Sequence, residues 1–309
     1  MWPLFLVLGI VSFLLVSLLI GLFVVYRISF YSPIKGQDND FGLTGPTVET
    51  CDVNEVNGMI RRMVEYPHED VYIKSFDRTK LRARLFLNEK SDTVCIMAHG
   101  YRGTACRDFS GGAYDMIQKG FNVLLIDERA HGLSGGHTIT FGAKESKDIN
   151  EWIKYAKARF GEDKRIVLIG ISMGGATVLA ASKYLSNKDK VIADCPFSKI
   201  RDILYDATEK LKLNSKICYP FVWLSAVLFA HFNPNKFDAS ADVKNSDAKI
   251  LIIHGNGDTL VPYTHSERVY LDNKDKVRYE IFEGAEHGLS YMVDQSRYQR
   301  IVNEFLDKE

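Results

Sequence analysis

The pattern of hydrophobic and polar residues begins with one long apolar run and then changes to shorter periods. Residues 3–26 carry no charge and are mostly Leu, Val, Ile and Phe. Because about 20 such residues cross a bilayer as a helix, this run predicts one N-terminal transmembrane helix. Apolar residues then recur at helical spacing over 53–64, and alternate with polar residues over 71–75 and 80–86. These periods predict a short amphipathic helix followed by a pair of strands.

From residue 93 onward, buried strands and amphipathic helices alternate along the chain. Short apolar runs predict strands at 93–98, 122–126, 166–169, 191–194, 249–254 and 276–283. Helical spacing predicts helices at 108–118, 144–160, 176–185 and 295–306. This alternation is typical of a mostly parallel sheet with helices on both faces. The predicted fold class is therefore α/β, with a doubly wound sheet.

One stretch, residues 196–243, interrupts the alternation. It contains an apolar run from Cys218 to His231, which is short for a membrane span. Inserted between two sheet strands, it predicts a helical cap over the strand ends, and a peripheral pair of helices is the alternative. The predicted organisation is an anchor over 1–31, a linker with a short amphipathic helix over 32–70, and an α/β domain over 71–309 with its cap at about 196–243.

A cleaved signal peptide is the alternative reading of the N-terminal run. No Lys or Arg precedes the run, and it exceeds the roughly 7–15 residues of a usual signal core, so an uncleaved single-pass anchor is favoured. Arg27 and Lys35 follow the run, which leans toward a cytoplasmic C-terminal part. Because a linker separates the run from the first strand, deletion of residues 1–31 is expected to leave a soluble, active domain.

Composition excludes several classes of partner. Lys plus Arg and Asp plus Glu number 39 each, so no basic surplus points to nucleic acid. The sequence has no Gly-rich phosphate loop, no C-x-x-C pair of cysteines, and no two histidines with zinc-site spacing. We therefore predict neither a cofactor nor a metal, and the sequence leaves the oligomeric state open.

The strongest chemical signal is the segment Gly170-Ile-Ser-Met-Gly174, which lies between a predicted strand and a predicted helix. This is the G-x-S-x-G pattern of a nucleophile elbow, where a serine sits on a strained turn. Neighbours without a Cβ allow strand and helix to approach closely. The turn would expose the Ser172 hydroxyl and aim the Met173 N–H at a developing oxyanion. A Gly-rich turn without chemistry is the alternative.

Two further residues follow predicted strands on the same sheet edge. Asp258 lies in His254-Gly-Asn-Gly-Asp258, and His287 lies in Gly284-Ala-Glu-His-Gly288. Active residues gather at the carboxyl ends of parallel strands, and the order Ser, Asp, His is that of an α/β-hydrolase triad. His287 would take the proton from Ser172, and Asp258 would orient the imidazole.

Other readings of these residues stay open at this stage. Asp194 and Asp127 also end strands and are rival acids, Asp258 alone suits a turn, and His287 alone suits an exposed loop. Five other histidines of the domain are interpreted as structural, loop or core residues: His99, His131, His137, His254 and His265.

The second oxyanion donor is predicted to be the backbone N–H of Tyr101, on the loop after the strand at 93–98. The Tyr101 side chain would shape the acyl pocket. Apolar cap residues complete the predicted pocket: Phe221, Trp223 and Leu224.

Taken together, these stretches resemble α/β-hydrolases of the serine aminopeptidase and monoacylglycerol-lipase type, which include bacterial membrane-anchored hydrolases. The resemblance rests on His99-Gly-Tyr101, Asp127–Ser134, Gly170–Gly174, His254–Asp258 with Val261-Pro262, and Glu286-His-Gly288. It covers about residues 71–309. The motif His-Gly-Tyr replaces the HGGG form of many lipases.

The resemblance implies a serine hydrolase that forms an acyl-enzyme from a carboxylic ester, either a small molecule or a lipid. A peptidase, amidase or acyltransferase using the same triad is the first alternative. A non-catalytic hydrolase-like domain that binds at the membrane is the second.

Overall fold

The fold is seen in a computed structural model that describes residues 2–32, 41, 43 and 46–308. Residues 33–40, 42, 44 and 45 of the predicted linker, which include Lys35, lie outside these residues. An eight-stranded sheet forms the centre, in the order β1-β2-β4-β3-β5-β6-β7-β8. Its strands are β1 Glu69–Lys74, β2 Lys80–Phe86, β3 Thr93–Ala98, β4 Asn122–Asp127, β5 Arg165–Ile171, β6 Lys190–Asp194, β7 Lys249–Gly255 and β8 Val277–Phe282.

All eight predicted strands are present, and the pairing confirms a mostly parallel sheet. The strand β2 runs antiparallel to β1 and β4, whereas every pairing from β4 to β8 is parallel. The carboxyl ends of β3, β5, β6, β7 and β8 therefore meet at one edge, as in other open α/β sheets. The turns that follow these strands carry the predicted site.

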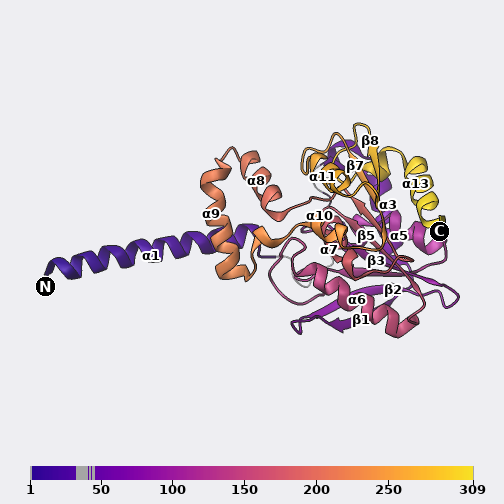
Figure 1. The fold of residues 1–309 in the computed structure, drawn as a ribbon, viewed down its shortest axis with the longest axis horizontal. Helices are drawn as coiled ribbons and strands as arrows, with labels where there is room; N and C mark the ends of the chain where they lie inside the picture. Colours follow the sequence, from indigo (N-terminus) through magenta and orange to yellow (C-terminus); the bar gives the residue numbers. More distant parts are fainter. Residues whose placement is uncertain (1, 33–40, 42, 44–45, 309) are drawn as a thin grey trace.

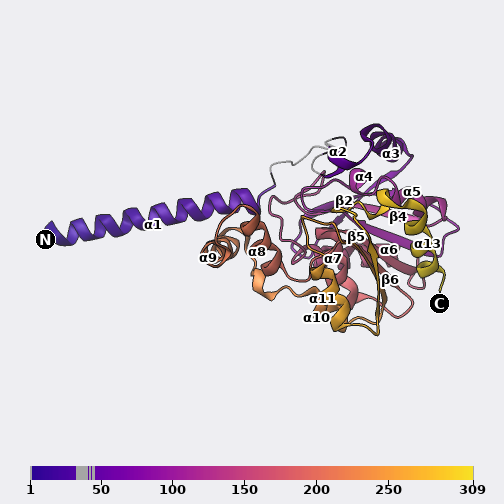
Figure 2. The same cartoon turned by 90° about the horizontal axis from the view of Figure 1, so that it is seen from above.

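Helices cover both faces of the sheet (Figures 1 and 2). Beyond the helices of the N-terminal run and the cap, they are α2 Pro46–Thr50, α3 Val53–Glu65, α4 Ala105–Asp108, α5 Gly112–Gln118, α6 Glu145–Phe160, α7 Met173–Ala181, α10 Ala239–Lys244, α11 Thr264–Asp272, α12 Ser290–Val293 and α13 Gln295–Asp307. A short 3₁₀ turn, η1 Ser182–Tyr184, extends α7.

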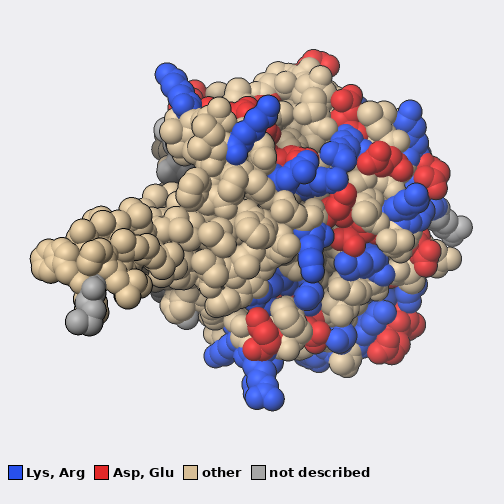
Figure 3. Space-filling view, turned by 60° about the vertical axis from the view of Figure 1, so that its left-hand side comes forward, with Lys and Arg blue, Asp and Glu red and all other residues tan. Residues whose placement is uncertain are grey.

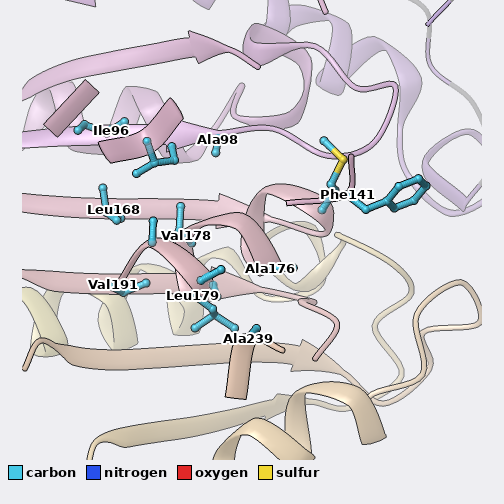
Figure 4. Packing of buried hydrophobic residues seen from close by; sticks show 14 of the residues in the cluster. Ile96, Ala98, Phe141, Leu168, Ala176, Val178, Leu179, Val191 and Ala239 are labelled. Atoms are coloured by element: carbon cyan, nitrogen blue, oxygen red, sulfur yellow. The ribbon is translucent and has the colours of Figure 1, made fainter. Parts of the chain in front are cut away.

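Alternate residues of the strands β3 to β7 enter two separate cores. Ile96 and Leu168 pack with α7 on one face, where Figure 4 shows Val178 and Leu179 against the strands. Their neighbours Met97 and Ile169 pack on the other face with α5 and α13. This alternation follows from the period of two in a strand, and it fixes the register of the sheet.

Two predicted helices differ from those observed. The helix expected over 108–118 is two helices, α4 and α5, separated by residues 109–111. Gly111 and Gly112 lower helix propensity there, and a Cβ on Gly111 would overlap the Tyr291 ring. The helix expected over 176–185 starts three residues earlier, because the elbow turn leads directly into α7.

The predicted cap forms helices between β6 and β7. They are α8 Ile200–Lys210, α9 Ser215–Ser225, the π-helical turn η2 Ala226–Ala230 and the 3₁₀ turn η3 Pro234–Lys236. In Figures 1 and 2, α8 and α9 stand beside the sheet, next to the inner end of the N-terminal helix. His231 adopts a left-handed conformation, with φ of 55°, and ends η2.

The N-terminal run is a single helix, α1 Trp2–Ser29. By length and composition it meets the requirements of a membrane span, as a signal sequence would. Every residue from Trp2 to Gly21 is exposed, whereas Leu22, Tyr26 and Phe30 are buried. A linker follows this run in the sequence, but the end of the run is not independent of the domain, because Tyr26 and Phe30 join the main core and Leu22 is buried beside the cap.

Candidate active site

Ser172 occupies a strained turn between β5 and α7. Its φ of 56° and ψ of −117° lie outside the regions that side chains usually adopt. A Cβ on Gly174 would overlap the carbonyl oxygen of Ala98, and one on Gly170 would overlap the backbone of Gly174. Only glycine fits at both positions, so the sequence around the serine is what allows strand and helix to meet. The Ser172 N–H donates to the carbonyl oxygen of Asp194 at 2.8 Å and holds the turn.

A line of hydrogen bonds joins the three residues predicted as a triad. The Ser172 Oγ lies 2.8 Å from His287 Nε2, and His287 Nδ1 lies 2.7 Å from Asp258 Oδ2. Asp258 follows β7 and His287 follows β8, so the two neighbouring strands bring them together. An ionised Asp258 only accepts hydrogen bonds. Nδ1 of His287 therefore carries the proton, and Nε2 is left to accept from the serine hydroxyl.

Asp258 is held as a carboxylate by four donors. Its Oδ1 accepts from the backbone N–H groups of Leu260 at 2.8 Å and Val261 at 2.7 Å. Its Oδ2 accepts from His287 and also from His254 Nε2, at 3.1 Å. Burial alone would raise the pKa of Asp258, but hydrogen bonds from both histidines hold that pKa well below its usual value.

His254 is a residue whose part in the site the sequence did not reveal. It was interpreted as a loop or core histidine, and it is indeed fully buried. Its Nδ1 lies 2.7 Å from Ser266 Oγ, so the ring is fixed on both sides. The usable signal was its spacing of four residues from Asp258 across a Gly-rich turn. That spacing folds the imidazole back onto the carboxylate.

The two rival acids have other partners. Asp127 Oδ2 accepts from Arg82 Nη1 at 3.1 Å and from the Leu133 N–H at 3.0 Å. Asp194 is buried at the end of β6, where burial raises the pKa of its carboxyl to about 7. Asp127 is thus engaged by Arg82, Asp194 favours its protonated form, and the carboxylate bonded to His287 Nδ1 is that of Asp258.

The loop after β3 packs against the serine. The Gly100 N–H donates to Asp108 Oδ2 at 2.9 Å, and the Gly103 N–H donates to the Gly100 carbonyl at 3.0 Å. A Cβ on Gly100 would lie 3.4 Å from the Ser172 Cβ. Tyr101 follows in this loop, and Met173 opens α7, where the first N–H groups of a helix have no intrahelical partner.

His99 is a structural residue, as the sequence suggested. It is fully buried, its Nδ1 lies 2.9 Å from the Gly100 carbonyl oxygen, and its Nε2 accepts from the Glu128 N–H at 3.1 Å. Both ring nitrogens are therefore engaged with the backbone, and the ring supports the loop from beneath.

The same loop binds the inner end of α1. The Tyr101 hydroxyl donates to the Ser29 carbonyl at 2.9 Å, while its ring stacks on Phe141 at 4.8 Å. The Arg102 Nη2 donates to the carbonyls of Ile28 at 2.7 Å and Tyr31 at 3.2 Å. The end of α1 is thus tied to the loop that carries a predicted oxyanion donor, a link that no local sequence pattern indicated.

The predicted pocket residues of the cap divide into two groups. Trp223 packs against the main core and donates from Nε1 to Asn233 Oδ1 at 3.1 Å. Phe221 is 47% exposed and Leu224 is partly exposed. The structure turns these two away from the buried side of α9, because the core contacts are made by residues on the opposite side of the helix.

A metal ion does not suit the donors gathered here. Ligand atoms of Cys195, Asp258 and His287 lie within 4.8 Å of one another. Burial raises the pKa of the Cys195 thiol well above its ordinary value, and a neutral thiol is a poor ligand. Both other groups already form the hydrogen-bonded line to Ser172.

Comparison with known proteins finds a family model and curated relatives that match parts of the chain. Residues 89–235 match the family model described as serine aminopeptidase, S33. YqkD of Bacillus subtilis, an uncharacterised protein, is 31% identical over 194 residues, covering 62% of this chain and 64% of its own. A thiohydrolase of Aspergillus aculeatus is 28% identical over 135 residues, 43% of this chain and 42% of that protein. The chain thus spans less than two thirds of these curated relatives.

Solved structures with the same fold also match this chain. An esterase of Pyrococcus furiosus superposes with a TM-score of 0.63 at 25% identity, covering 80% of this chain and 92% of the esterase. A hydrolase from a Penicillium species shares the fold at 18% identity, with a TM-score of 0.60 over 78% of this chain and 97% of the other. The chain has the α/β-hydrolase fold, and its matches are to α/β-hydrolases.

Proposed function

We propose that this chain is a serine hydrolase that cleaves a carboxylic ester through an acyl-enzyme. The observation that carries the proposal is the line from Ser172 Oγ through His287 to Asp258, with 2.8 Å and 2.7 Å between successive heavy atoms. Ser172 attacks the ester carbonyl, and His287 takes its proton and returns it to the leaving alcohol. Asp258 holds the tautomer and stabilises the imidazolium. Water then attacks the acyl-enzyme by the same route.

The negative oxygen that forms on attack needs donors in fixed positions. The proposed donors are the backbone N–H groups of Met173, at the start of α7, and Tyr101, in the loop beside the serine. One such donor contributes about 2.7–4 kcal/mol to the transition state. Met173 is the first residue of α7, and hydrogen bonds of Gly100 and Gly103 hold the loop that carries Tyr101. Tyr101 and Trp223 are the proposed pocket residues.

An ester is proposed over an amide from what similar proteins act on. The Pyrococcus structure is an esterase, and a Danio rerio relative, 24% identical over 188 residues, is a lysophosphatidylserine lipase. The family model is described as a serine aminopeptidase, so an amide remains the competing substrate. A thioester and acyl transfer to another alcohol use the same acyl-enzyme.

We also propose that α1 is an uncleaved membrane anchor. Leu22, Tyr26 and Phe30 are buried against the cap and the main core, and the Tyr101 hydroxyl donates to the end of the helix. Cleavage after this run would remove these contacts and expose the core they cover. The folded unit then includes the last two turns of α1 as well as the sheet domain.

The experiment is a substrate panel measured on the full-length protein in detergent. p-Nitrophenyl esters of graded acyl length are compared with aminoacyl p-nitroanilides, each beside the Ser172→Ala variant. Ester turnover that disappears in the variant is the expected result. Serine-dependent turnover of the anilides alone would assign a peptidase. Absence of any serine-dependent turnover would instead favour a binding domain.

A further inference from the structure

The outer face of α9 carries apolar side chains where a water-facing helix carries polar ones. Ile217 is 65% exposed, Phe221 47% and Leu228 43%, and Leu224 between them is partly exposed. Their spacings of four, three and four residues place them within about 60° of one another, at about 100° per residue. These four residues, three on α9 and Leu228 on the adjoining turn η2, define the outer face of α9.

The opposite side of the same helix is already occupied. Tyr219 and Ala226 are buried, and Tyr219 packs on Tyr205 of α8 with 4.7 Å between ring centroids. The outer face is therefore not the side by which α9 joins the domain. An apolar stripe that the domain leaves uncovered marks a contact with something else.

The position of α9 along α1 indicates what that contact is. The exposed part of α1, Trp2 to Gly21, has 20 residues and is about 30 Å long at 1.5 Å per residue, which is the thickness of the bilayer hydrocarbon. Burial begins at Leu22, where the Ser225 Oγ donates to its carbonyl at 2.9 Å. If the exposed part spans the bilayer, α9 lies at the level where the span leaves it.

The surroundings of α9 have the character of a membrane surface contact. The turn before it exposes two more apolar residues, Leu211 at 70% and Leu213 at 51%. Exposed Lys212 and Lys216 flank them, and helices that lie in the bilayer interface combine such an apolar face with basic residues at its border. Figure 3 shows uncharged surface continuing from α1 onto the adjoining cap, with Lys and Arg around its edge.

We infer that the outer face of α9 lies in the boundary between headgroups and acyl chains of the bilayer that α1 spans, and that the ester substrate is an amphiphile drawn from that bilayer. The substrate half of this inference rests on the proposed function. The site is close to this surface in structural terms, because the α1 end beside α9 also accepts hydrogen bonds from Tyr101 and Arg102. The loop that carries Tyr101 is therefore hydrogen-bonded to the end of α1 that adjoins α9 and the inferred lipid contact.

The contact is tested first by depth-dependent quenching, which needs no activity. Full-length protein is reconstituted into phosphatidylcholine–phosphatidylglycerol vesicles whose acyl chains are brominated. The parent carries Trp2→Phe, which removes the tryptophan of the span. Ile217→Trp adds a probe on the outer face, and Leu271→Trp is the matched control on α11, where Leu271 is 53% exposed.

We expect the added tryptophan at position 217 to be quenched at least roughly twice as strongly as the one at 271, since an interfacial helix buries its apolar face in the acyl boundary. Equal quenching at the two positions would overturn the contact. So would a blue-shifted but unquenched signal at 217, which would mean that a second copy or another protein covers the face.

The substrate half is tested with Ile217→Asp combined with Leu228→Asp, and Leu271→Asp is the control. Turnover of long-chain esters presented in vesicles should fall about tenfold, while turnover of soluble p-nitrophenyl acetate stays within about twofold, because only the lipid contact is lost. An equal fall on both esters would overturn this half. If the unsubstituted protein cleaves neither ester, the hydrolase proposal fails, and the quenching result still decides the membrane contact.

Discussion

Phe30→Ala tests the finding that the end of α1 belongs to the fold. Phe30 has no exposed surface, and its ring lies 6.0 Å from that of Phe141 and 5.5 Å from that of Phe232. Removing a buried Phe side chain costs about 3–5 kcal/mol, because transfer energy is lost and a cavity remains. At about 2–4 °C per kcal/mol for a large domain, the melting temperature should fall by about 6–20 °C.

The assay is thermal unfolding of the full-length protein in detergent, followed by intrinsic fluorescence. Phe5→Ala is the matched control, since Phe5 lies in the outer part of α1 and is 68% exposed. Its melting temperature should stay close to that of the unsubstituted protein. A shift for Phe30→Ala no larger than for Phe5→Ala would refute the docking of α1.

Truncation extends the same reasoning to activity. Deletion of residues 1–20 keeps the buried turns that begin at Leu22 and should preserve ester turnover per folded molecule. Deletion of residues 1–31 removes Tyr26 and Phe30 as well as the acceptors of Tyr101 and Arg102, and it should lose both stability and turnover. Equal activity of the two truncations would show that the helix end is dispensable.

Four further substitutions test the site and its supports. Asp258→Asn should lower kcat by about 10⁴-fold, because the wrong imidazole tautomer is held, whereas Asp194→Asn should keep most of kcat in the same ester assay. Burial raises the pKa of Asp194 from 3.8 to about 7, so the folded chain keeps a proton that the unfolded chain releases. Stability should therefore fall as pH rises from about 4 to 7, and urea unfolding of Asp194→Asn should show a smaller fall. His254→Asn should lower kcat more than it raises KM, since it removes a donor to Asp258; unchanged kcat would make His254 a packing residue only. Gly174→Ala should yield no soluble folded protein in expression trials, because its Cβ would overlap the Ala98 carbonyl.

Local sequence patterns were sufficient to predict the strands of the sheet and the nucleophile elbow. Each strand was visible as a short apolar run, and the fixed geometry of parallel strands brings their carboxyl ends together. Ser172, Asp258 and His287 could therefore be named from chain order and spacing alone. Their roles as nucleophile, acid and base remain predictions.

Contacts between segments far apart in the sequence could not be predicted from local patterns. Tyr101 and Ser29 are 72 residues apart, and nothing in the period of either segment encodes their hydrogen bond. The run of α1 is uniformly apolar up to Tyr26, so the sequence does not mark the residue at which the helix becomes buried. That residue is set by the cap, which packs against the helix there. The orientation of α9 could not be predicted for a related reason, since an all-apolar helix does not show which side meets the core.

The most direct measurement is covalent labelling by a fluorophosphonate, followed by mass mapping of the adduct. The probe reacts with a serine that a neighbouring base activates, so it reports the proposed chemistry without knowledge of the substrate. We predict a single adduct on Ser172 in the folded protein, and none in Ser172→Ala or after heat denaturation. Labelling that persists in Ser172→Ala, or a folded protein that never labels, would contradict the account.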